Sequence, residues 1–108
     1  MELMIKVTVL YPNKEGAKFD LDYYLNSHTP MVGKKLGNAL KGITIEHGIG
    51  GGLPGSPPPF IVICDLLFDS TEAFNAAFEP HATEIMADIL NYTDSVPLVQ
   101  ISEVKLSR

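Results

Sequence analysis

The segment FIVICDLLFD, residues 60–69, decides the fold because it is apolar on both faces of the strand that its composition predicts. Successive side chains of a strand point to opposite faces. One face therefore carries the largely apolar set Phe60, Val62, Cys64, Leu66 and Phe68. The other face is also mainly apolar and carries Ile61, Ile63, Asp65 and Leu67. Such a strand belongs inside a sheet that must be covered on both sides.

The segments around this strand predict three further strands, at residues 3–11, 43–49 and 96–106. A helical region that begins at Asp20 separates the first two strands, and a second one, capped by Asp69 and interrupted by Pro80, follows the third. The order βαββαβ with right-handed crossovers predicts a ferredoxin-like α+β fold. We expect one domain, residues 1–108, with a four-stranded antiparallel sheet and both helices on one face.

Helices on one face leave the other face of the sheet uncovered. An exposed apolar face of this size favours association, so we expect a homodimer in which a second sheet covers it, as in a dimeric α+β barrel. Alternation places a polar set on this uncovered face: Lys6, Thr8, Asp65, Gln100 and Ser102. An apolar wall with a few polar groups is typical of a small-molecule pocket, so these residues are predicted to bind or orient a ligand.

Asp65 and the second strand each leave alternatives open. A carboxylate in a buried strand needs a partner, or its pKa rises. Asp65 therefore either forms a structural ion pair with Lys6 or orients a catalytic group. Either Glu46 or His47 joins the polar set, and His47 otherwise lies on the solvent side of an edge strand.

The segment YYLNSHTP, residues 23–30, holds the strongest candidate for acid–base chemistry. A helical stripe at i, i+3, i+4 and i+7 places His28 on the inward face together with Leu21, Tyr24 and Leu25. Pro30 disfavours helical geometry at Thr29, so the helix is expected to end or kink there. His28 then either interacts with the helix dipole as a cation or reaches a cavity and transfers protons near neutral pH, with Tyr24 as an orienting group.

Composition argues against several other classes of function. A net charge of −5 with eight scattered Lys and Arg residues disfavours nucleic acid as a partner. No apolar run reaches the ~20 residues of a membrane span, and the first residues do not resemble a signal peptide, so a cytoplasmic protein is expected. The three histidines lack metal-ligand spacing, and no metal site is predicted. The Gly/Pro-rich residues 48–59 predict a flexible connection, a lid or a dimer arm.

A family resemblance adds to this interpretation. The run FDLDYYLNSHTPMV, residues 19–32, resembles the EthD family of dimeric α+β barrel proteins, and MADILNYTDSVPLVQISEV, residues 86–104, is similar to the C-terminal half of that family. The resemblance implies a ferredoxin-like subunit that dimerises into a barrel. It places the motif's histidine on His28 and its aromatic pair on Tyr23 and Tyr24.

The family is named for bacterial degradation of ethyl tert-butyl ether, and its wider superfamily includes cofactor-free monooxygenases, isomerases, cyclases and haem-binding enzymes. We therefore expect a homodimer that binds a small, mainly apolar organic molecule. As an enzyme it would catalyse cofactor-independent proton transfer on a carbonyl or phenolic compound, with His28 as acid or base and Asp65 as an orienting or catalytic partner. The alternatives are a non-catalytic accessory protein of a degradation pathway and a monooxygenase-type relative, with or without haem.

Overall fold

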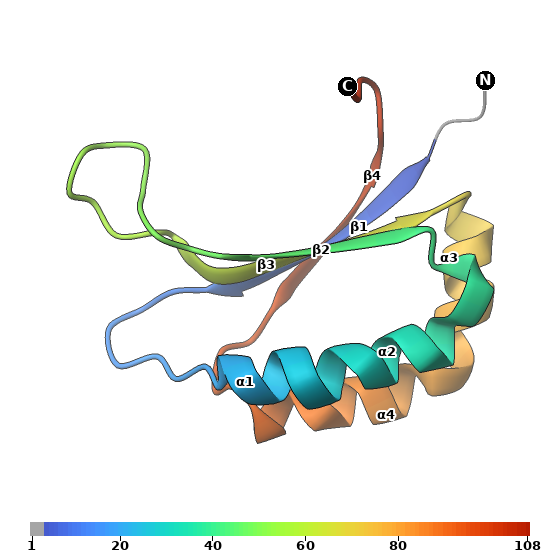
Figure 1. The fold of residues 1–108 in the computed structure, drawn as a ribbon, viewed down its shortest axis with the longest axis horizontal. Helices are drawn as coiled ribbons and strands as arrows, with labels where there is room; N and C mark the ends of the chain where they lie inside the picture. Colours follow the sequence, from blue (N-terminus) through green and yellow to red (C-terminus); the bar gives the residue numbers. More distant parts are fainter. Residues whose placement is uncertain (1–3) are drawn as a thin grey trace.

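In the computed structural model, which describes residues 4–108, a four-stranded antiparallel sheet carries all of the described helices on one face (Figure 1). The strands lie in the order β2-β3-β1-β4. Their bounds are Ile5–Pro12 (β1), Gly42–His47 (β2), Phe60–Phe68 (β3) and Leu98–Glu103 (β4). This order confirms the predicted ferredoxin-like fold. The predicted first residue of β1, Leu3, lies outside the described residues.

The register of the strands shows which side chains share a face. Residues directly opposite each other in an antiparallel pair point to the same side. Val9 lies opposite both Cys64 and Val99 on the helix side, whereas Thr8 lies opposite Asp65 and Gln100 on the open side. The predicted assignment of the faces of β1, β3 and β4 is therefore confirmed.

The register also settles the ambiguous strand β2. Thr44 pairs with Asp65, so Glu46, two residues further along, shares the open face with Asp65. His47 pairs with Val62 and lies on the helix side of the sheet. Of the two alternatives, Glu46 joins the polar set of the open face, and the grouping of His47 with that set is wrong because a shift of one residue reverses the face.

The first helical region is continuous across Pro30. It consists of α1 (Leu21–Tyr23), a π-helical turn (Tyr24–His28), α2 (Thr29–Leu36) and a final 3₁₀ turn (Gly37–Ala39). The Asp20 side chain caps it by accepting from the backbone N–H of Tyr23 at 3.0 Å. Thr29 keeps helical dihedral angles, and its N–H bonds the Tyr24 carbonyl five residues back. The helix therefore does not end at Thr29, because the wider π turn accommodates the proline.

The second helical region is broken where the sequence predicts it. It consists of α3 (Thr71–Phe78), a 3₁₀ turn (Glu79–His81) that contains Pro80, α4 (Ala82–Ala87) and a 3₁₀ turn (Asp88–Asn91). Its cap is Ser70, whose hydroxyl accepts from the N–H of Ala73 at 3.0 Å, and not Asp69 as predicted. Ser and Asp are equally good N-cap residues, and Ser70 directly precedes Thr71, the first residue of α3, whereas Asp69 is one residue too early.

The apolar layer between sheet and helices forms the core. Phe68 and Val62 of β3 are fully buried, and Phe68 packs edge-on against Phe74 of α3. Residues 48–59 leave the sheet as a long loop that projects away from the body of the molecule (Figure 1). Among residues 4–108, no helix combines the length and the apolar character that crossing a membrane requires.

Candidate functional site

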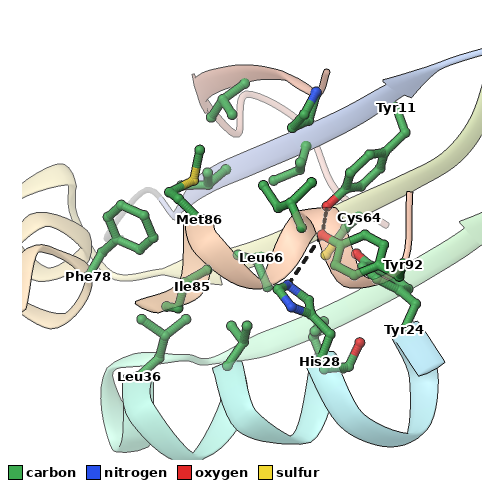
Figure 2. A pocket seen from close by; sticks show the side chains of 18 of the residues that line it. Tyr11, Tyr24, His28, Leu36, Cys64, Leu66, Phe78, Ile85, Met86 and Tyr92 are labelled. Carbon is green, nitrogen blue, oxygen red and sulfur yellow. Dashed lines mark hydrogen bonds between the residues drawn. The ribbon is translucent and has the colours of Figure 1, made fainter. Parts of the chain in front are cut away.

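A cavity of about 390 Å³ lies between the sheet and the helices (Figure 2). This volume is within the ~300–1,000 Å³ range of small-molecule pockets. Its walls come from the helix-facing residues of the sheet and from the inner sides of both helical regions. Met86 of α4 and Val99 of β4 line the cavity and are about half exposed, so they lie at its rim.

The two ends of the cavity differ in chemistry. Figure 2 shows Leu36, Ile85 and Phe78 at one end, and the polar groups of the lining at the other. The polar end contains three tyrosines, the imidazole of His28 and the thiol of Cys64; the tyrosines are Tyr11, Tyr24 and Tyr92. A ligand that fills this space would meet hydrocarbon along most of its length and hydrogen-bonding groups at one end only.

The aromatic rings at the polar end hold one another in place. Tyr24 stacks on His28 with ring centroids 5.4 Å apart and an angle of 15° between the planes. These residues are four positions apart in the π turn, which brings their side chains to the same side of the helix. The hydroxyls of Tyr11 and Tyr92 are hydrogen-bonded at 2.7 Å, and both tyrosines are 2% exposed. The two tyrosines are therefore buried and hold each other in place.

The imidazole of His28 is fixed by a carboxylate from the other helical region. His28 Nδ1 lies 2.8 Å from Asp88 Oδ2. The hydroxyl of Tyr23 and the side-chain amide of Asn91 donate to Asp88 Oδ1 at 2.7 and 2.9 Å. Three donors thus hold this carboxylate in one orientation, and a carboxylate so held positions the ring of its histidine.

The protonation states follow from this geometry. Desolvation lowers the pKa of His28 from 6.5, although the hydrogen bond and charge of Asp88 act in the opposite direction. Desolvation tends to raise the pKa of Asp88, but the hydrogen bonds from Tyr23, Asn91 and His28 together lower it. The pair at neutral pH is therefore an ionised Asp88 and a neutral His28.

A neutral His28 that donates from Nδ1 to Asp88 carries a free electron pair on Nε2. The Tyr92 hydroxyl forms a long hydrogen bond with Nε2 at 3.5 Å (Figure 2), which is weaker than one of ordinary length. Both residues line the cavity. A ligand group placed there can therefore give its proton to Nε2 or bond the Tyr92 hydroxyl.

The predicted polar set lies elsewhere. Lys6, Thr8, Asp65, Gln100 and Ser102 do share one face, where Thr8 Oγ1 donates to Asp65 Oδ1 at 2.7 Å and Gln100 donates to Ser102 at 3.0 Å. That face is the open side of the sheet, so none of the five lines the 390 Å³ cavity. The structure does not bring Asp65 to His28, and between the described atoms of Asp65 and Lys6 it shows no ion pair. A ligand-binding function for this face stays a prediction.

Three residues of the site were not found from the sequence: Asp88, Tyr92 and Tyr11. Asp88, Asn91 and Tyr92 are spaced i, i+3 and i+4, which indicates one side of a helix, and Tyr11 continues the alternation of Val7 and Val9. These signals were present, but an acid on an amphipathic helix usually faces water. Among residues 4–108, no group of three or more His, Cys, Asp or Glu side chains is placed to bind a metal ion.

The fold and the cavity define a ferredoxin-like α+β protein with an internal site of the size and lining that small organic molecules require. Residues 16–95 match the model of the EthD domain, and the chain belongs to the EthD family. Among curated proteins, none matches the chain.

Solved structures agree with this assignment. An EthD-like protein from Ralstonia eutropha is 48% identical, with 100% of this chain and 97% of that chain covered and a TM-score of 0.93. An EthD-family protein from Bacillus halodurans is 22% identical, with coverage of 94% and 98% and a TM-score of 0.71. A dimeric ferredoxin-like protein from Thermobifida fusca is similar in fold, with 14% identity, coverage of 96% and 93%, and a TM-score of 0.54.

Proposed function

We propose that this protein binds a small, mainly apolar organic molecule in the cavity between sheet and helices and catalyses proton transfer on it without a cofactor. The observation that carries the proposal is the buried His28, which lines the cavity and is held by Asp88 through Nδ1. A neutral imidazole with one nitrogen held by a carboxylate and the other only weakly hydrogen-bonded is the arrangement of a general base. The reaction class is the abstraction of a proton next to a carbonyl or from a phenol, as in isomerisation, dehydration or cyclisation.

Proton abstraction by His28 can be tested with an assay that does not depend on knowing the natural substrate. Exchange of carbon-bound hydrogen for deuterium next to the carbonyl of 2-tetralone, followed by NMR in D₂O, reports proton abstraction directly. The wild-type protein should accelerate exchange above the buffer rate, and His28→Gln should lose this acceleration, by about 10²–10⁴-fold for a general base. His81→Gln, in the 3₁₀ turn away from the cavity lining, is the matched control and should exchange like the wild type. Equal exchange by wild type and His28→Gln would refute the catalytic assignment.

A second candidate is a non-catalytic binding protein. One observation favours it: among the described residues, every buried side-chain nitrogen and oxygen has a hydrogen-bond partner. The His28–Asp88 pair could therefore serve only to hold the two helical regions together. In that case 2-tetralone would bind to the wild type without any acceleration of exchange, and His28→Gln would change stability alone.

The proposal includes a homodimer formed through the open face of the sheet. The protein from Thermobifida fusca that has a similar fold is described as dimeric. In this chain, Leu98 of β4 points to the open side, and 57% of its surface is exposed. Leu98→Glu should convert a dimer to a monomer in light scattering after gel filtration. Leu90→Glu is the control, because Leu90 is 84% exposed within the helical region and lies away from the sheet. A monomeric wild type would contradict the dimer.

A further inference from the structure

The charge of the cavity restricts its ligand more than the size does. Among the described residues that line it, none is a lysine or an arginine, and none is an aspartate or a glutamate. All eight cationic side chains of the protein lie at positions 6–108 and are therefore among the described residues. A ligand in this cavity consequently has no opposite charge to pair with.

The polar groups of the lining are uncharged at neutral pH. Burial raises the pKa of the Cys64 thiol to about 11. Burial likewise raises the pKa values of Tyr24 and Tyr92 above the ordinary value of 10.0. His28 is neutral for the reason given above. The cavity therefore offers hydrogen bonds to a ligand, but no full charge.

The charge in contact with His28 at the polar end of the cavity is negative. Asp88 lies directly behind His28, with Oδ2 at 2.8 Å from Nδ1. An anionic group next to Nε2 would lose its hydration in an apolar space and would also face this carboxylate across a single ring. Both effects raise the free energy of a bound anion.

We propose that the cavity selects neutral molecules with a long apolar body and one hydrogen-bonding head, such as a ketone or a phenol, and rejects carboxylates of the same shape. A ketone head accepts from the hydroxyl of Tyr92, and a phenol head can also donate to Nε2 of His28. The body extends toward Ile85 and Phe78 (Figure 2). This inference rests on the proposed function for the location of the site, but it concerns binding and not turnover.

The orientation follows from where hydrogen bonds are available. Because Nε2 and the Tyr92 hydroxyl are 3.5 Å apart, Nε2 can accept from a ligand hydroxyl and the Tyr92 hydroxyl can donate to a ligand carbonyl. Tyr92 also shares a hydrogen bond with Tyr11, and when Tyr11 is the donor the hydroxyl hydrogen of Tyr92 is available to a ligand carbonyl. Near Ile85 and Phe78 the lining is hydrocarbon, so a polar head there would lose its hydrogen bonds to water without replacement.

Three related probes test the charge selection and the orientation in one experiment. 2-Acetylnaphthalene carries a methyl group on its carbonyl carbon where 2-naphthoate carries a charged oxygen. Naphthalene has the same apolar body and no polar head. We expect equilibrium dialysis at pH 7.5 to show that the ketone binds at least about tenfold more tightly than the carboxylate. Equal or tighter binding of the carboxylate would overturn the charge selection, and so would failure of the ketone to bind.

The variant Tyr92→Phe tests where the head lies. Loss of one neutral hydrogen bond should weaken the ketone by about 3- to 10-fold, and naphthalene should bind as it does to the wild type. Unchanged naphthalene binding also shows that the variant is folded. If Tyr92→Phe weakens both ligands equally, or neither, the orientation is wrong.

The outcomes separate this inference from the proposed reaction. Selective ketone binding without acceleration of deuterium exchange would remove the catalytic part of the proposed function and leave the ligand class intact. Acceleration of exchange together with equal binding of carboxylate and ketone would remove the proposed ligand class and leave the catalytic part of the proposed function intact.

Discussion

Replacement of Asp88 by asparagine removes the charge that positions His28 and keeps the shape of the side chain. The wild-type carboxylate accepts three hydrogen bonds, from Tyr23, His28 and Asn91. The asparagine amide has only one oxygen. If that oxygen keeps the hydrogen bonds from Tyr23 and Asn91, the NH₂ group of the amide faces His28 Nδ1. His28 must then accept at Nδ1 and carry its proton on Nε2.

The magnitude follows from the loss of charge-assisted hydrogen bonds. A bond to a charged group contributes about 1.5–3 kcal/mol and a neutral one about 0.5–1.5 kcal/mol. Asp88 keeps 17% of its side chain exposed, so solvent screens part of this difference. We expect the free energy of unfolding to fall by about 2 kcal/mol, equivalent to roughly 8 °C in Tm for a domain of this length.

Two measurements check this expectation. Urea denaturation followed by circular dichroism gives the stability, and ¹⁵N NMR of the histidine ring gives the tautomer. Asp69→Asn is the matched control, because Asp69 is more than half exposed and 3.9 Å from Lys41, and it should change stability by less than about 0.5 kcal/mol. If Asp88→Asn and Asp69→Asn unfold at the same urea concentration, and Nδ1 of His28 still carries its proton, the positioning function of Asp88 is refuted.

Three further predictions concern pH and packing. Burial lowers the pKa of His28 from 6.5, so the unfolded chain binds more protons than the folded chain as the pH falls through this range. The free energy of unfolding should therefore fall as the pH drops from 7 to 5. In a pH series of urea titrations, His28→Gln should show a smaller fall than the wild type. Phe68→Ala, at a fully buried core position, should cost about 3–5 kcal/mol by urea denaturation, whereas Leu90→Ala at an exposed position should cost less than about 0.5 kcal/mol. Gly48→Ala should cost about 1–3 kcal/mol in the same assay, because a Cβ there would lie 2.3 Å from a backbone oxygen, while Gly52→Ala meets no atom within 4 Å and should unfold like the wild type.

The sheet could be predicted from the sequence because its information is local. Alternation along 60–69 assigned the two faces of β3 correctly, and the order of the elements gave the topology. Strand β2 was ambiguous because one residue of register decides between Glu46 and His47. A proline such as Pro30 predicts a helix end only when the helix cannot rearrange, and a π turn is one such rearrangement.

The site could be predicted only in part, because half of it depends on packing between segments distant in sequence. His28 was identified from helical spacing, but its partner Asp88 lies 60 residues away and resembles an ordinary surface acid. The cavity was expected on the open face, where Asp65 stands out among apolar residues. That expectation stays a prediction. The cavity beside His28 lies among residues whose pattern is that of a core, because alternation shows which side chains share a layer but not where the layers leave space between them.

The π-helical turn at Tyr24–His28 has a consequence for how the chain tolerates changes in length. A π turn contains one residue more than the α-helix needs to cover the same path, and each residue of an α-helix turns the chain by about 100°. Deletion of Ser27, which is exposed, should let this segment return to α-helical spacing without unfolding α2. The same deletion would leave Tyr24 and His28 three positions apart, still on one side of the helix, but would change the angle between their rings and weaken their stacked pair. Helix length and site geometry are thus coupled through a single surplus residue.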